Sequence, residues 1–452
     1  MSGPRDPRVR VVLLGLVPAA LLPAVVVWDV TLGTALLLAA LVVVGLLARL
    51  EWALVLFVAV SPLEDFLATE VNPQATKALG GLVFAALAVR LLARRTPMPS
   101  HAAHRCLVVF LLLLLAASVR SANGAPGLEV LLRYLSFAGV YLAAFVVFQD
   151  LRWLVRVFAA YVFGSGVAAY LGLQTFLTGE AARAEGPLND PNDLAFVLVV
   201  AIPLALALHA RSSRPGWSVI AVLCGLGAAA TVSRGGALAL LAMAVWAMAT
   251  RVLTKRIALA GAVVLGSGLA VGAWYAADLV SRALQQKSYV AASNVDTRLL
   301  RWRAAVEMMG DSPLLGTGPA GFRLNYDTYA AAYDPTAEFG RTVVHQMFFE
   351  VGAELGLPAL LAFTAFVAVA LLSADTARRL ARDRTTWLMA VATEAGLIAT
   401  VSASLFLTEQ YYAPLWLLAA AAVSLQQRVE RGDAVGDRRV GTLPLPWEPR
   451  GR

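Results

Sequence analysis

The chain has 452 residues, of which 59% are hydrophobic and 15% are charged, and its mean hydropathy is +0.72. A soluble protein carries about 25% charged residues, so this composition excludes an ordinary soluble protein and indicates an integral membrane protein. The net charge of +8 comes from Lys and Arg that lie mostly between apolar runs. No soluble basic domain is present to bind nucleic acid, and we expect no nucleic-acid partner.

Apolar runs long enough to cross a membrane recur along the whole chain. A helix needs about 20 apolar residues to cross roughly 30 Å of hydrocarbon. The sequence therefore predicts an all-α integral membrane protein with about 12 to 14 transmembrane helices. The fourteen candidate spans are 9–28, 30–48, 51–68, 77–94, 105–121, 130–148, 152–176, 191–210, 216–233, 235–252, 257–277, 344–373, 386–408 and 411–427. Pro62, Glu64 and Asp65 interrupt the run at 51–68, which leaves a re-entrant hairpin open as an alternative there.

Basic residues gather in every second connection between these spans, such as Arg211 and Arg214 or Arg378 to Arg384. The positive-inside rule then places the N-terminus in the cytoplasm and the long connection outside. We expect four parts. They are an N-terminal transmembrane bundle (1–277), an extracytoplasmic loop subdomain with an amphipathic helix (278–343), C-terminal transmembrane helices (344–427) and a disordered cytoplasmic tail (428–452).

Two polar clusters precede spans at the outer side. In GPLNDPND, residues 186–193, Asp190 before Pro191 predicts a helix N-cap, and the free N–H groups there also suit a phosphate or a sugar hydroxyl that Asn192 could contact. In SRGG, residues 233–236, Arg234 lies close to hydrocarbon. Such an arginine must be paired, snorkel to the interface or bind a ligand.

Two further clusters belong to the long loop and the span that follows it. The segment 297–309 has helical spacing, with Leu299, Trp302, Val306 and Met309 on one face and Arg298 and Arg301 on another. It predicts an amphipathic helix on the membrane surface, either as a lipid anchor or as a pyrophosphate-binding element. The turn-forming PLLGTG at 313–318 follows, with glycines that allow backbone to approach a ligand.

His345 opens the twelfth span at the outer surface, and Glu350 and Glu354 lie one turn apart inside that span. A lone histidine at an interface is often structural, but a neutral imidazole is also the usual side chain for proton transfer near pH 7. The two glutamates need partners, which predicts a polar cavity beneath His345.

The four clusters place arginines, a histidine and carboxylates on one side of a chain that has no GxxxxGK[ST] phosphate loop. Cys106 and Cys224 both lie in apolar runs and predict neither a disulfide framework nor a zinc site. We therefore expect no metal and no cofactor. Arginines could neutralise a departing pyrophosphate, which suits a lipid-linked donor that already carries the energy in its leaving group.

In order along the chain, GPLNDPNDLA (186–195), SRGGALA (233–239), TRLLRWRAA (297–305), PLLGTG (313–318) and HQMFFEVGAELGL (345–357) resemble the O-antigen ligase and polymerase superfamily of bacterial membrane glycosyltransferases. The resemblance covers about the C-terminal 60% of the chain. It implies a GT-C-like fold, an undecaprenyl-pyrophosphate-linked glycan donor and metal-independent, inverting transfer in the outer leaflet of the bacterial inner membrane. The family often has Asn after the histidine, whereas this chain has Gln346, which puts the identity of the acceptor in doubt.

The resemblance also implies roles for particular residues. Arg234 and Arg298 would hold pyrophosphate, and His345 would orient or deprotonate the acceptor hydroxyl. Further candidates for substrate contact are Arg301, Asn192, Asp190, Glu354 and Tyr326.

The expected partners are the lipid-linked oligosaccharide, membrane lipids and a hydroxyl acceptor. That acceptor is a lipid A core sugar, a growing glycan or a protein side chain, so that a ligase, a polymerase and a protein O-oligosaccharyltransferase all stay open. A small-anion transporter of the bicarbonate type is the rival from another class, although the sequence shows no repeated halves. A membrane scaffold without catalytic activity would not explain the arginines in the outer loops.

Overall fold

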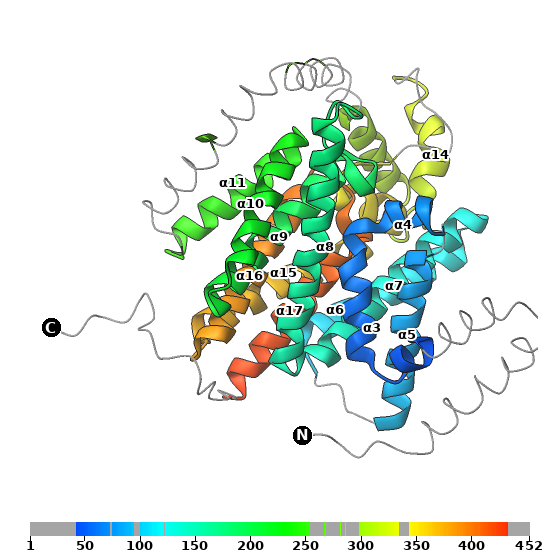
Figure 1. Ribbon diagram of the computed structural model, residues 1–452. Helices are drawn as coiled ribbons and strands as arrows, with labels where there is room; N and C mark the ends of the chain where they lie inside the picture. Colours follow the sequence, from blue (N-terminus) through cyan, green and yellow to red (C-terminus); the bar gives the residue numbers. More distant parts are fainter. Residues whose placement is uncertain are drawn as a thin grey trace, which may run out of the picture.

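The computed structural model describes residues 42–72, 75–94, 100–121, 123–252, 266–267, 281, 285, 298–333 and 343–432. Every regular element in these ranges is helical (Figure 1). The elements are α3 (Leu50–Val60), η1 (Ser61–Leu63), α4 (Glu64–Glu70), α5 (Ala75–Arg94), α6 (Ala102–Arg120), α7 (Gly124–Phe148), α8 (Leu151–Leu177), η2 (Gly186–Leu188), α9 (Pro191–Ser212), α10 (Pro215–Ala230), α11 (Arg234–Ala249), α14 (Gly321–Ala330), α15 (Met347–Leu380), α16 (Arg384–Ser404), η3 (Glu409–Tyr411) and α17 (Ala413–Glu430). Residues 298–311 form a further helix.

Eight segments among the described residues are long and apolar enough to cross a membrane, which confirms an all-α integral membrane protein. Seven of them coincide with α5, α6, α7, α8, α9, α15 and α16, and the eighth is Leu50–Glu70. The apolar helices α10 and α11 are shorter, with 16 residues each. The predicted span 9–28 and most of 30–48 and 257–277 lie outside the described residues, as does the C-terminal segment from 433 onward.

The segment predicted at 51–68 is interrupted where its sequence suggested. α3 ends at Val60, the short η1 contains Pro62, and α4 starts afresh at Glu64. Proline has no N–H to continue the hydrogen-bond pattern, so a break at this point is expected. In Figure 1, α4 lies across the end of α3, and this places Glu64 and Asp65 at the end of the bundle rather than on its flank.

Successive helices run in opposite directions, and contacts between connections define two ends. At what we call the loop end, Asn123 Nδ2 donates to the carbonyl oxygen of Thr317 at 3.0 Å, and Ala184 N donates to that of Ala230 at 3.1 Å. At the opposite, basic end, Arg384 Nη2 donates to the carbonyl oxygen of Ala210 at 3.0 Å. The functional candidates lie at the loop end.

The core of the bundle is formed mainly by α9, α15, α16 and α17. α9 packs against α8, α10, α11 and α16, while α15 packs against α6, α16 and α17. α17 is nearly wholly buried and rich in alanine, and it extends three residues beyond the predicted end of the last span at 427. Because buried helices need small, close-packing residues, its composition reflects its central position.

A second, smaller hydrophobic cluster lies in the loop region. Its buried members come from the helix at 298–311, from α14 and from the start of α15, and they are Ala304, Ala305, Met308, Phe322, Tyr326, Ala330, Val344 and Ala353. This cluster fixes the loop helix against the start of α15.

Candidate active site

The first two predicted motifs meet at the loop end. Asp190 is the N-cap of α9, as expected, and its Oδ1 accepts from Asn192 N at 2.6 Å. Ser233 Oγ, the N-cap of α11, donates to Asn192 Oδ1 at 2.9 Å. A Cβ on Gly236 would come within 2.9 Å of Ala195 Cβ, so this glycine lets α11 start directly against α9. The SRGG motif thus brings two helices into close contact at this end.

Arg234 is the first residue of α11 and its side chain is exposed. The backbone before it is held in an unusual conformation, because Val232 has a φ of +50°. A positive φ in a β-branched residue is a true outlier and is typical of functional sites. The carbonyl oxygen of Thr231, which accepts from Arg183 Nε at 2.7 Å, anchors this turn. Arg234 therefore follows a turn whose backbone is held in place.

Residues 298–311 form a helix over the segment predicted to be amphipathic, and the predicted apolar face is not the one that packs into the protein. Leu299 and Val306 are about half exposed, at 53% and 51%, whereas Ala304, Ala305 and Met308 are buried. Helical spacing places Arg301 on the same side as Ala304, Ala305 and Met308. The buried face therefore starts with an arginine, and the small residues below it allow the helix to pack closely on the bundle.

His345 lies in the left-handed region, with a φ of +54°, immediately before α15. Gln346 is the N-cap of that helix, and its Oε1 accepts from Phe349 N at 2.5 Å. The amide oxygen of Gln346 satisfies a helix N–H that would otherwise lack a partner. The glutamine at this position therefore has a structural role in orienting His345.

The electrostatic couplings show that these segments converge. Burial lowers the pKa of Arg298, and the neighbouring charges of Arg301 and Arg234 lower it further, while Asp190 raises it. His345 has its pKa lowered to about 4 by burial first, then by Arg301 and Arg298, with Asp190 acting in the opposite direction. Among the described residues, no carboxylate lies within salt-bridge distance of Arg234, Arg298 or Arg301. The result is a cluster of positive charge around a histidine that is neutral at pH 7.

The lowered pKa of His345 leads to a first prediction. If neutral His345 is required, the acid limb of kcat/KM falls near pH 4 rather than near the ordinary 6.5, because kcat/KM reports groups of the free enzyme. Arg301→Gln removes the charge that contributes most to the lowering after burial, so the acid limb is expected to move to higher pH. Arg303→Gln is the control, since Arg303 lies on the same helix, 62% exposed and paired with Glu307. An acid limb that stays in place in Arg301→Gln would contradict a proton-accepting role for His345.

The PLLGTG turn contacts the backbone of α15. α15 is broken at Gly356, and Pro358 has no N–H to donate to the carbonyl oxygen of Glu354. That oxygen instead accepts from Gly318 N at 2.7 Å, the carbonyl oxygen of Ala353 accepts from Thr317 N at 3.0 Å, and Leu357 N donates to that of Pro313 at 2.7 Å. The loop thus supplies the hydrogen bonds that the kinked helix lacks.

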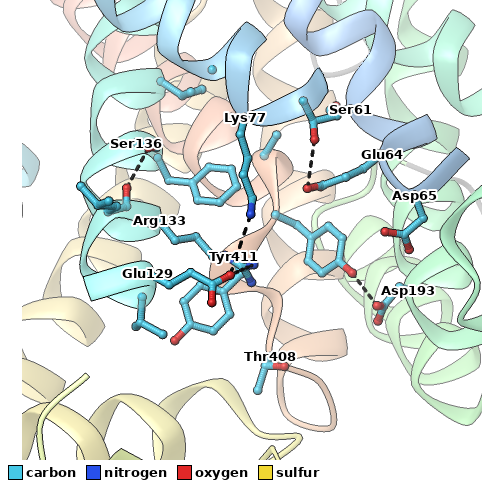
Figure 2. A pocket seen from close by; sticks show the side chains of 18 of the residues that line it. Ser61, Glu64, Asp65, Lys77, Glu129, Arg133, Ser136, Asp193, Thr408 and Tyr411 are labelled. Atoms are coloured by element: carbon cyan, nitrogen blue, oxygen red, sulfur yellow. Dashed lines mark hydrogen bonds and ion pairs between the residues drawn. The ribbon is translucent and has the colours of Figure 1, made fainter. Parts of the chain in front are cut away.

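Below the kink, the two glutamates of α15 line a cavity of about 780 Å³, in agreement with the predicted polar cavity. Glu354 Oε1 accepts from Phe322 N at 3.3 Å, and Glu350 Oε1 accepts from Gln410 Nε2 at 3.3 Å. Glu350 Oε2 is buried and finds no hydrogen-bond partner in the described part of the chain. We call this cavity the acidic pocket, since it also contains Glu64, Asp65 and Asp193 (Figure 2).

Tyr326 has a different position from the other candidates. It is 1% exposed and packs in the loop-region cluster, with its ring centroid 5.4 Å from that of Phe322. It is not among the described residues that line the acidic pocket. Substrate contact by Tyr326 stays a prediction, and packing accounts for its position.

Sequence reasoning missed the segment 407–412, LTEQYY, between α16 and α17. Tyr412 donates to Asp193 Oδ2, and Glu409 is fully buried with both carboxylate oxygens unpartnered among the described residues. Burial raises the pKa of Glu409 well above its ordinary value, and Asp193 and Asp190 raise it further. A run of polar residues between two apolar spans was the available signal.

Glu409 supplies a second prediction. In the unfolded chain its pKa is near 4.5, whereas in the fold it is raised, so the folded protein binds the extra proton. Its contribution to stability is complete below pH 4.5 and is lost as the pH rises through the raised pKa, by up to about 1.4 kcal/mol per pH unit. Glu409→Gln is therefore expected to raise the melting temperature in detergent, and by more at pH 8 than at pH 5. Glu180→Gln, at an exposed loop position of the same end, should leave the melting temperature unchanged at both pH values. Equal melting of Glu409→Gln and the parent at pH 8 would contradict the prediction.

No group of three or more His, Cys, Asp or Glu side chains in the described ranges is arranged to hold a metal ion. The polar atoms of the site belong instead to the arginine cluster and to the acidic pocket beside it.

The described residues thus define a multi-span helical membrane protein that carries an arginine cluster and a cavity lined by acidic residues at one end. Residues 219–364 match the O-antigen ligase family, which confirms the predicted resemblance of this chain to the O-antigen ligase superfamily. Arg234, Arg298, Arg301 and His345 lie within the matched residues, whereas Asp190 and Asn192 lie before them. No curated protein matches the chain.

Proposed function

We propose that the protein transfers a preassembled glycan from a lipid pyrophosphate, of the undecaprenyl type, to a hydroxyl acceptor. The observation that carries this proposal is the convergence of Arg298 and Arg301 on His345, with Arg234 beside Arg298 and Asp190 as the nearby counter-charge. Guanidinium groups stay charged and grip pyrophosphate oxygens in pairs, so three of them suit a dianionic leaving group.

In the proposed reaction, the acceptor oxygen attacks the anomeric carbon of the donor sugar and the bond from that carbon to the pyrophosphate oxygen breaks. Attack opposite to the leaving group inverts the anomeric configuration. The acceptor proton passes to neutral His345, and the two electrons of the broken bond leave with the lipid pyrophosphate, where the arginines stabilise the developing charge. Protein charges perform the neutralisation in this scheme, and it requires no metal ion.

The residues proposed to act directly are Arg234, Arg298 and His345. Arg301, Asp190, Asn192 and Glu354 are proposed to position the substrate. We place the reaction at the outer leaflet of the inner membrane, with residues 278–343 as the extracytoplasmic subdomain between the two transmembrane parts. The opposite end of the bundle carries Arg211, Arg214 and Arg382, which supports this orientation.

A transfer assay tests the proposal. Purified protein in proteoliposomes is given an undecaprenyl pyrophosphate oligosaccharide in the presence of EDTA, and the lipid-linked glycan is followed by chromatography and mass spectrometry. Elongated lipid-linked chains would identify a polymerase, and consumption only after a core lipid or a protein is added would identify a ligase or a protein O-oligosaccharyltransferase. No turnover with any acceptor, together with uptake of labelled bicarbonate that requires Arg234 and Arg298, would overturn the proposal in favour of a transporter.

A further inference from the structure

The acidic pocket is a chamber separate from the arginine cluster but adjacent to it. Arg234, Arg298, Arg301 and His345 are not among its described lining residues. It is connected to the cluster by Asp193, one helical turn after Asp190, and by Val343, two residues before His345. A substrate with pyrophosphate at the arginines could therefore extend a sugar into this chamber.

One wall of the chamber carries excess positive charge (Figure 2). Lys77 Nζ lies 4.0 Å from Glu129 Oε1, Arg133 Nη2 lies 3.7 Å from the same oxygen, and Arg323 Nη2 lies 3.7 Å from Glu129 Oε2. Three cations share one carboxylate, which leaves an excess of two positive charges. These side chains are between 31% and 57% exposed, so water and ligands can reach them.

The facing wall carries carboxylates that have no cation within ion-pair distance among the described residues, although Arg133 and Lys77 act on Glu64 from further away. Glu64, Asp65 and Asp193 lie together on the other side of the chamber in Figure 2. Glu64 Oε1 accepts from Thr76 Oγ1 at 3.5 Å, and Asp193 accepts from Tyr412, but none of the three forms an ion pair with a described residue. One side of the chamber thus holds three carboxylates without a close cation, while its other carboxylates lie nearer to the cationic wall.

A further observation indicates that the chamber is built for a ligand. Glu350 lines the chamber, is 5% exposed and keeps Oε2 buried without a hydrogen-bond partner among the described residues. Leaving such an oxygen unpaired is unfavourable, and a bound donor group would remove that cost. The aromatic rings of Phe57, Tyr411 and Tyr412 also line the chamber and offer flat apolar faces to a pyranose.

We propose that the acidic pocket binds a sugar that carries a free amino group, with the ammonium between Glu64, Asp65 and Asp193 and with ring hydroxyls accepting from Lys77 and Arg133. An ammonium supplies three donors and one positive charge, which matches what the acidic wall lacks. This inference rests on the proposed function, because it assigns a chemistry to the glycan that the enzyme handles. The amino sugar belongs either to the donor glycan or to the acceptor.

The test is direct binding to the full-length protein in lipid nanodiscs. The probes are the β-1,4-linked trisaccharide of glucosamine and its fully N-acetylated form, which differ mainly in charge at the amino groups. Isothermal calorimetry at neutral pH is expected to show the free-amine probe binding at least tenfold more tightly. Asp65→Asn and Glu64→Gln should each weaken that binding tenfold or more, while leaving the weak binding of the N-acetylated probe unchanged.

Glu70→Gln is the matched control, because Glu70 lies on α4 as well but is exposed and outside the pocket. Thermal melting of every variant verifies folding. Equal affinity for the two probes, or full affinity of both Asp65→Asn and Glu64→Gln for the free amine, would overturn the inference. Binding does not require turnover, so a failed transfer assay with specific binding would count against the proposed function alone. Transfer of purely neutral glycans without specific binding would count against this inference alone.

Competition assigns the source of the amino sugar. If a lipid-linked donor that bears free amino sugars displaces the trisaccharide, the pocket holds donor glycan. If the trisaccharide binds equally well while the donor occupies the arginine cluster, the pocket holds the acceptor. Either result supports the site.

Discussion

Arg298→Ala is expected to reduce kcat/KM for glycan transfer by on the order of 10³-fold, because removing one preorganised donor to a developing negative charge has effects of this size. Arg298 lies within the field of Arg234, Arg301 and His345, so its guanidinium is placed where a pyrophosphate would gain charge. The loss should fall mainly on kcat, since charge on the leaving group increases as its bond breaks.

The helix that carries Arg298 also provides the control. Arg303 lies less than two turns further on, but it is 62% exposed, its Nε is 2.9 Å from Glu307 Oε1, and its guanidinium is 4.3 Å from the Tyr333 ring. Arg303→Ala is expected to change kcat/KM by no more than about twofold, since exposed pairs contribute little.

Arg298→Lys refines the test, because lysine keeps the charge but loses the paired donors. It should recover part of the activity. Activity of Arg298→Ala above one tenth of the parent value would rule out Arg298 as a pyrophosphate ligand. The assay is initial transfer velocity at matched amounts of folded, membrane-reconstituted protein.

The features that local sequence determines were predictable. Spans such as α6, α8 and α9 follow from runs of apolar residues alone, and the caps at Asp190 and Ser233 follow from residue type next to a helix start. Arg234, Arg298 and His345 could be selected because charged residues are scarce in this chain and because they occur in short motifs. The structure brings them together although more than 100 residues separate the first from the last.

The features that depend on distant pairs were not predictable. The positive wall of the acidic pocket needs Lys77, Glu129 and Arg323 to meet from α5, α7 and α14, and none of these residues lies in a recognisable motif. The face of the helix at 298–311 that packs on the protein was not predicted: it holds Ala304 and Ala305, while Leu299 and Val306 of the predicted apolar face are about half exposed. Hydrophobic size is a poor guide where close helix packing requires small side chains.

The glycines of PLLGTG were predicted to allow a close backbone approach, and the fold gives that approach a structural role. They do permit close backbone approach, but to the broken helix α15. A Cβ on Gly316 would lie 2.3 Å from the carbonyl carbon of Glu354, and one on Gly356 would lie 2.5 Å from that of Leu314. Each glycine packs against the backbone of the segment that carries the other. The turn and the kinked helix can therefore pack this closely only if both positions lack a side chain.

Gly316→Ala is therefore expected to destabilise the protein by about 2 to 5 kcal/mol. Gly316 has a φ of +62°, which costs an alanine about 1 to 2 kcal/mol, and the overlap with Glu354 backbone adds about 1 to 3 kcal/mol because backbone cannot move aside as a flexible side chain can. Both penalties apply to the folded state, and the apparent melting temperature in detergent, measured at one scan rate, should fall by several degrees.

Gly310→Ala is the matched control, because Gly310 lies in the preceding helix and a Cβ added there would meet nothing within 4 Å. At that position an alanine should stabilise the helix by about 0.5 to 1 kcal/mol. Opposite shifts from two identical substitutions six residues apart would show that the turn is fixed by its contact with α15. If Gly316→Ala melted like the parent, the turn would not be docked on the kink. In that case the hydrogen bonds from Gly318 N and Thr317 N could not be what holds the broken helix, and with it Glu354, at the floor of the pocket.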